Sequence, residues 1–154
     1  MTDLLFLIDT AYDHVSWHGT SLRGSLRGLS PQKAAWRPDP RRHNIWEVTV
    51  HAAYWKYAAW RRLTGATRGS FPLRGSNWFV RPETPSPIAW RADQALLDDT
   101  HRELRAAVAA LRPGRLDAVL PGGTVTTRAL VAGSAAHDLY HAGQIQLIKK
   151  LAPR

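Results

Sequence analysis

The segment HDLYHAGQIQLIKK, from His137 to Lys150, decides how this chain is interpreted. Successive residues of an α-helix are rotated by about 100°, so one helical face carries His137, His141, Gln144 and Ile148. The segment therefore predicts an inward face with two imidazoles one turn, about 6 Å, apart. A buried histidine usually has an ordinary hydrogen-bond partner. Burying two neutral imidazoles without partners would cost a few kcal/mol of folding free energy. Two imidazoles so spaced can instead bind one metal ion, as in paired-histidine zinc sites.

Helical periodicity outside this segment predicts the fold. Four long segments have apolar residues at spacings of three and four, at about 2–29, 44–63, 87–111 and 127–151. Asn44 and Glu47 predict a capping box at the start of the second helix. Residues 66–87 form a long loop rich in Gly, Pro and Arg, which Trp78 and Phe79 are expected to hold in place. The predicted fold class is an all-α four-helix bundle, with residues 1–154 as a single domain and this loop between helices 2 and 3.

A third metal ligand has to come from another helix, and His51 in EVTVHAAYWKYAAW is the best candidate. Glu47, one turn earlier, is a candidate acceptor for the second ring nitrogen of His51. Tyr54 shares that face and is a candidate pocket residue. Gln144 either supports this site or is a structural buried amide. The opposite face of the same helix is also apolar, which suggests that one face meets a partner chain.

The other histidines offer a rival site. His14 and His18 also lie four residues apart on an apolar stripe of the first predicted helix, where they are expected to be extra ligands or to line the pocket. His43 in a loop and His101 at the edge of the third helix have ordinary structural interpretations. Asp138 points about 100° away from His137 and is expected at the surface.

Composition excludes several kinds of chemistry. The chain has no cysteine, so disulfides, thiolate ligands and a cysteine nucleophile are excluded, and any thiol must arrive with the substrate. The net charge is +9, but the 21 basic residues are scattered and form no nucleic-acid-binding motif, so nucleic-acid binding is the least favoured function. No run of about 18 apolar residues predicts a membrane span, and the start does not resemble a signal peptide, which favours a cytoplasmic protein.

The sequence resembles the DinB/YfiT-like superfamily. The resemblance covers nearly the whole chain in order, through SWHG at 16–19, SPQKAAWRP at 30–38, the segment around His51 and HDLYHAGQIQLIKK. It implies a four-helix bundle, often a homodimer, with one divalent metal ion held by His51, His137 and His141. It also implies metal-dependent chemistry on small molecules, including transfer of low-molecular-weight thiols and hydrolysis.

The chemistry of three imidazoles agrees with this resemblance. Three neutral histidines suit Zn, Ni or Fe and leave an open position where a water or thiol would bind with a lowered pKa. We therefore expect a metal-dependent thiol S-transferase or hydrolase acting on a small molecule. The alternative is a non-catalytic, stress- or damage-induced metal-binding protein, in which His18 supplies a fourth ligand.

Overall fold

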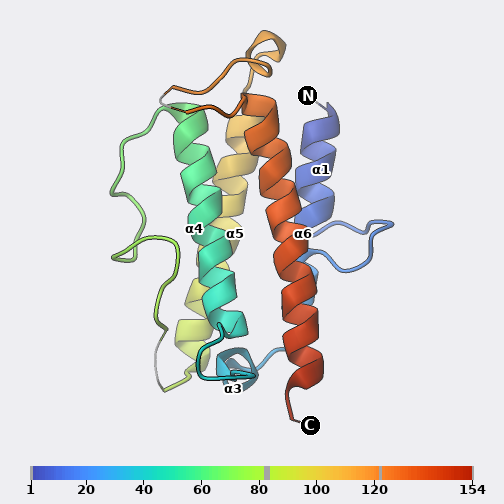
Figure 1. Cartoon of the computed structure of the whole chain (residues 1–154), viewed down its shortest axis with the longest axis vertical. Helices are drawn as coiled ribbons and strands as arrows, with labels where there is room; N and C mark the ends of the chain where they lie inside the picture. Colours follow the sequence, from blue (N-terminus) through green and yellow to red (C-terminus); the bar gives the residue numbers. More distant parts are fainter. Residues whose placement is uncertain (1, 82–83, 122, 154) are drawn as a thin grey trace.

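The computed structural model describes residues 2–81, 84–121 and 123–153, and these residues are all-helical, without strands. Four long helices run side by side along the long axis (Figure 1): α1 (Thr2–Tyr12), α4 (Ile45–Thr64), α5 (Pro87–Ala109) and α6 (Thr127–Leu151). The connections contain α2 (Leu22–Ser25), α3 (Pro31–Ala35) and the 3-10 turn η1 (Pro113–Arg115). Neighbouring helices α4 and α6 run antiparallel (Figure 1). Within the described residues, no helix is both long and apolar enough to cross a bilayer.

Local sequence signals set the start and end of α4. The Asn44 side chain accepts a hydrogen bond from the Glu47 backbone N–H at 2.8 Å, and the Glu47 carboxylate accepts one from the Asn44 N–H at 3.3 Å. The predicted capping box is therefore confirmed. The helix ends at Gly65, whose φ of 76° lies in the left-handed region that favours glycine.

The first helix is shorter than its periodicity predicts. The expected helix over residues 2–29 is wrong, because α1 ends at Tyr12 and the chain is irregular until α2. Val15 and Trp17, which follow Tyr12, are fully exposed. Gly19 has a φ of 98°, which a right-handed helix cannot contain. The apolar spacing continued past Tyr12, but the backbone turned away from the helical path.

The apolar face of α4 opposite His51 is covered within one chain. Trp46, Val50 and Ala53 have no exposed surface. The Trp46 indole N–H donates to Asp93 of α5 at 2.5 Å, and its ring lies 5.1 Å from that of Trp90 on the same helix. This face of α4 therefore meets the core of its own chain, whereas Trp55 on the His51 face is 43% exposed.

The long connection between α4 and α5 lies alongside α4 (Figure 1). Phe79 is buried, and its ring lies 5.5 Å from that of Tyr54 and 5.3 Å from that of Phe71. Trp78 stacks on His51 of α4, so both aromatic residues that were expected to hold the loop contact side chains of α4. The loop thereby closes one side of the site described next.

Candidate metal centre

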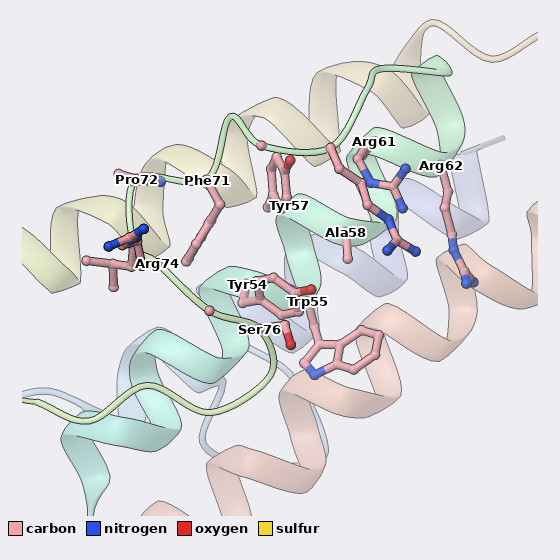
Figure 2. Close-up of a pocket in the computed structure, with 14 residues that line it drawn as sticks. Tyr54, Trp55, Tyr57, Ala58, Arg61, Arg62, Phe71, Pro72, Arg74 and Ser76 are labelled. Atoms are coloured by element: carbon pink, nitrogen blue, oxygen red, sulfur yellow. The ribbon is translucent and has the colours of Figure 1, made fainter.

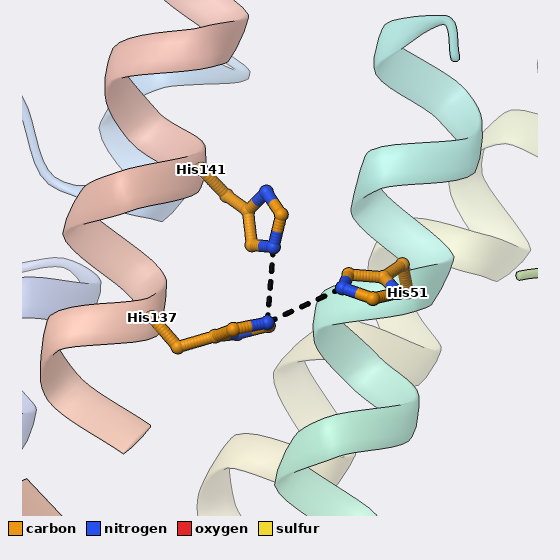
Figure 3. Close-up of side chains that lie close together, drawn as sticks. All are labelled: His51, His137 and His141. Atoms are coloured by element: carbon orange, nitrogen blue, oxygen red, sulfur yellow. Dashed lines mark hydrogen bonds between the residues drawn. The ribbon is translucent and has the colours of Figure 1, made fainter. Parts of the chain in front are cut away.

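Three imidazoles from two helices converge on one point. His51 projects from α4, and His137 and His141 project toward it from α6 (Figure 3). The Nε2 atom of His137 lies 3.2 Å from Nε2 of His51 and 3.0 Å from Nε2 of His141. One ring nitrogen of each residue lies within 4.8 Å of the others. Nitrogens bound to a tetrahedral zinc ion at about 2.0–2.1 Å lie about 3.4 Å apart, so the two short separations suit ligands of one ion.

Hydrogen bonds outside the cluster fix which nitrogen carries a proton on two of the rings. His51 donates through Nδ1–H to the Asn77 carbonyl at 2.8 Å, and His141 donates through Nδ1–H to the Gln144 side-chain oxygen at 2.7 Å. A neutral imidazole has one N–H, so Nε2 of both rings carries a lone pair. His137 has at most one proton to offer these two atoms. At least one short contact would pair two lone pairs, and a cation bound by all three nitrogens removes that repulsion.

Burial keeps these three rings neutral, which is the form of imidazole that binds metal ions. It lowers the pKa of His51 to about 4 and, together with the neighbouring imidazoles, lowers the pKa of His137 to about 3. Burial also lowers the pKa of His141 below its ordinary value. Because all three rings are neutral at pH 7, a metal ion has no proton to displace from them.

Comparison with known families agrees with this geometry. The sequence model of the DinB superfamily matches residues 14–145, a range that contains all three imidazoles. The chain belongs to the DinB superfamily. Among curated proteins and among solved structures, none matches the chain. The resemblance seen in the sequence is confirmed, and the described residues of this DinB-superfamily protein include a histidine triad that can hold a metal ion.

The loop after α4 supplies the surroundings of His51 that the sequence did not reveal. Trp78 stacks between His51, at 3.8 Å between ring centroids, and His43, at 3.6 Å. Asn77 has a left-handed φ of 66°, and its side-chain oxygen accepts a hydrogen bond from Trp55 at 3.0 Å. Asparagine is one of the few residues that adopt this conformation readily. The conformation of Asn77 turns its carbonyl toward His51 while its side chain binds the neighbouring indole.

The partner predicted for His51 is a different residue. The carboxylate of Glu47 is buried and accepts hydrogen bonds from both terminal nitrogens of Arg37 and from His43 at 3.1 Å. Burial alone would raise the pKa of Glu47, but the bonds from Arg37 and His43 hold it below its usual value. The acceptor for His51 is the Asn77 carbonyl, so in this DinB-superfamily chain Glu47 secures the start of α4 instead.

The remaining candidates divide between the site and its surroundings. Gln144 contacts His141 directly, as noted above. Tyr54 lies in the aromatic cluster with Phe71 and Phe79 and lines an adjoining cavity of about 650 Å³ (Figure 2). His14 and His18 are exposed and lie outside the triad, so the prediction that they are extra ligands of this site is wrong.

A buried ion pair beside the triad was missed. Asp138, expected at the surface, is buried and pairs with the equally buried Lys56 of α4. The Lys56 Nζ atom lies 3.4 Å from Nδ1 of His101 on α5 and 4.8 Å from the ring centroid of Tyr12 at the end of α1. The Tyr12 and His101 rings stack at 3.6 Å. Each long helix thus contributes one residue to this cluster.

Proposed function

We propose that this DinB-superfamily protein is a metal-dependent enzyme that holds one divalent metal ion per chain with His51, His137 and His141 and acts on a small molecule. The observation that carries the proposal is the convergence of three Nε2 atoms, two of them aimed by acceptors on Nδ1. Within the described residues, no further His, Asp or Glu joins this group. Three protein ligands leave a coordination position for an atom of the substrate.

The reaction class follows from the donor set and from the composition of the chain. Zinc, nickel or iron bound by three imidazoles is a Lewis acid that lowers the pKa of a thiol or water. Because the chain has no cysteine, the nucleophilic sulfur would belong to the substrate, and we favour transfer of a low-molecular-weight thiol, with hydrolysis as the other candidate. Asn77 and Gln144 orient two of the ligand rings, and Trp78 keeps water from one face of His51.

A non-catalytic, stress- or damage-induced metal-binding protein is the alternative function. A structural metal site usually has four protein ligands. His18 was the sequence candidate for the fourth, and it is exposed on the loop after α1, outside the triad. The three-ligand arrangement therefore favours the enzyme.

The quaternary and domain organisation complete the proposal. We propose that the four long helices form a DinB/YfiT-like four-helix bundle and that residues 1–154 act as a single domain. The proposed homodimer is supported by Tyr140, Leu147 and Leu151, which lie on one face of α6 and are 57–63% exposed. Light scattering should give twice the chain mass for the wild type and a monomer for Leu147→Glu. A monomeric wild type would contradict the homodimer.

Metal stoichiometry tests the site. Metal-free protein is reconstituted with Zn²⁺, Ni²⁺ or Fe²⁺, and bound metal is measured after gel filtration. We expect about one ion per chain, lost in His137→Ala and retained in the matched control His14→Ala, whose imidazole is exposed outside the triad. A stoichiometry near zero, or one unchanged by His137→Ala, would contradict the proposal.

Turnover tests the enzyme. Metal-loaded protein is supplied with an electrophilic substrate and a small thiol, or with an ester, with and without chelator. We expect turnover that the chelator and His137→Ala both abolish. One bound ion per chain with no turnover of either substrate type would support the non-catalytic alternative.

A further inference from the structure

A groove of about 210 Å³ lies between α4 and α6, and His137 is part of its lining. Small residues open the groove: Ala58 and Ala59 on α4, and Gly133 and Ser134 on α6. On each helix these residues are three or four positions from the next lining residue, so they share one face. Because the small faces of the two helices oppose each other, the helices leave space here instead of packing together.

The two ends of the groove differ in chemistry. His137 and Trp55 lie at the end next to the imidazole cluster, and Arg62 lines the other end. Arg62 follows Trp55 by seven residues on α4, which is about 10 Å along the helix axis. Trp55 and Arg62 both project from α4 on the side of α6 (Figure 2). A molecule lying along the groove would therefore have its ends at an imidazole cluster and at a guanidinium.

Positive charge gathers beyond Arg62. Arg61, Arg62 and Arg68 also line an adjoining cavity of about 330 Å³. Among the described residues, no carboxylate lies within ion-pair distance of these three, whereas Arg81 pairs with Asp93. Guanidinium groups without a protein counter-ion attract anions and bind carboxylates through paired hydrogen bonds.

We propose that the groove binds a medium-chain carboxylate, with its hydrocarbon chain between Ala58 and Gly133, its carboxylate at Arg62 and its other end toward the triad. At about 30 Å³ for each water-sized unit, the volume suits roughly seven non-hydrogen atoms, the number of carbon atoms in octanoate beyond its carboxylate. This inference names the substrate class of the proposed enzyme. It rests on the proposed function only for the orientation toward the metal, since the groove and Arg62 are present without it.

Calorimetric titration with octanoate tests the carboxylate end, with octanamide as the uncharged probe of equal length. We expect the full chain, metal-free or metal-loaded, to bind octanoate at least tenfold more tightly than octanamide. Arg62→Gln removes this preference, and Arg91→Gln, an exposed arginine of α5 outside the groove, preserves it. Affinity should rise up to about fourfold per methylene group from butyrate to octanoate, because each CH2 leaves water. Equal affinities for octanoate and octanamide would overturn the proposal.

Gly133→Leu tests the groove itself. Gly133 lines the groove, and a Cβ atom built there meets nothing within 4 Å, so a side chain at this position starts in open space. We expect at least a tenfold loss of octanoate affinity with the circular dichroism spectrum unchanged. Gly143→Leu is the matched control, because Gly143 lies on the same helix with the same open space but outside the groove. Wild-type affinity in a folded Gly133→Leu would overturn the proposal, and if that variant does not fold, the Arg62→Gln comparison decides.

Metal content, measured on the same samples, separates the two proposals. Octanoate binding in a chain that binds no metal would leave the groove assignment intact and refute the metal-dependent function. One metal ion per chain without a preference for octanoate would do the reverse.

Discussion

Removing one partner of the Lys56–Asp138 pair should destabilise the protein far more than removing both. Both side chains are at most 2% exposed, and the pair joins α4 to α6. Asp138→Asn leaves the Lys56 ammonium buried without a counter-charge, and Lys56→Met leaves the Asp138 carboxylate likewise. An uncompensated buried charge costs about 3–5 kcal/mol, whereas replacing both partners of a buried pair with neutral groups is often close to neutral.

The surroundings of the pair indicate that removing one partner should cost an amount of unfolding free energy within this range. Among the described residues, the Lys56 ammonium has one further hydrogen-bond acceptor besides Asp138. This acceptor is Nδ1 of the neutral His101 ring, at 3.4 Å. The Tyr12 ring adds a cation–π contact at 4.8 Å, which is worth about 2 kcal/mol when desolvated. The second Asp138 oxygen, Oδ1, is buried without a hydrogen-bond partner among the described residues, so the intact pair is itself imperfectly satisfied. We therefore expect about 3–5 kcal/mol for each single variant and less than about 2 kcal/mol for Lys56→Met/Asp138→Asn.

Urea unfolding and thermal unfolding, both followed by circular dichroism, measure these differences in the free energy of unfolding. At about 2–4 °C per kcal/mol, the single variants should melt roughly 6–20 °C below the wild type. The m-values should stay equal, so that the shifts report stability and not a change in the denatured state. Two single variants that each cost less than about 1 kcal/mol, or a double variant that costs their sum, would refute the reasoning.

Three further changes test other parts of the structure. Gln144→Leu removes the acceptor that orients His141, so metal affinity in a chelator competition should fall about 10- to 100-fold, and Gln146→Leu, which changes the same residue type on the same helix, should have no effect. Burial lowers the pKa of His101 to about 2. Below pH 6.5 the unfolded chain therefore binds one more proton than the folded chain at this residue, and the free energy of unfolding falls by about 1.4 kcal/mol for each pH unit. His101→Phe removes this contribution, so the free energy of unfolding should fall less steeply as the pH is lowered. An unchanged slope of unfolding free energy against pH would contradict this assignment. Gly133→Ala should raise the unfolding free energy by about 0.5–1 kcal/mol, because alanine loses less backbone entropy in a helix, and a destabilised variant would show that the groove has no room there.

The sequence predicted the parts of the fold that depend on local signals. The limits of α4 follow from the capping residue Asn44 and from Gly65, both of which act within one helical turn. The pairing of His137 with His141 follows from helical periodicity alone. The length of α1 was wrong because periodicity records which residues are apolar but not where the backbone leaves the helix, and nothing local to Tyr12 marks that point.

Long-range contacts were beyond sequence reasoning. Asn77 is 26 residues from His51, and only the path of the loop over α4 brings its carbonyl to the ring. Asp138 was placed at the surface because it points about 100° away from His137. This holds only for a helix that is buried along one narrow face. The helix α6 packs against α1, α2 and α4, so more of its circumference is buried. A charged residue beside an inward one can then also be buried, and its partner Lys56 lies on another helix.

The buried cluster and the triad together fix how α4 and α6 are rotated about their axes. On α4, Lys56 follows His51 by five residues, which turns it about 140° away, and on α6, Asp138 is turned about 100° from His137. Lys56 and Asp138 therefore meet among Tyr12 and His101, inside the four helices, while the imidazoles meet at the edge of the α4–α6 interface. A rotation of either helix that brought the imidazoles out of line would also separate the ion pair. Because this separation leaves two charges buried and uncompensated, the polar cluster resists the rotations that would disperse the three Nε2 atoms. We therefore expect the cluster to help keep the ligand rings in position although it does not contact their Nε2 atoms.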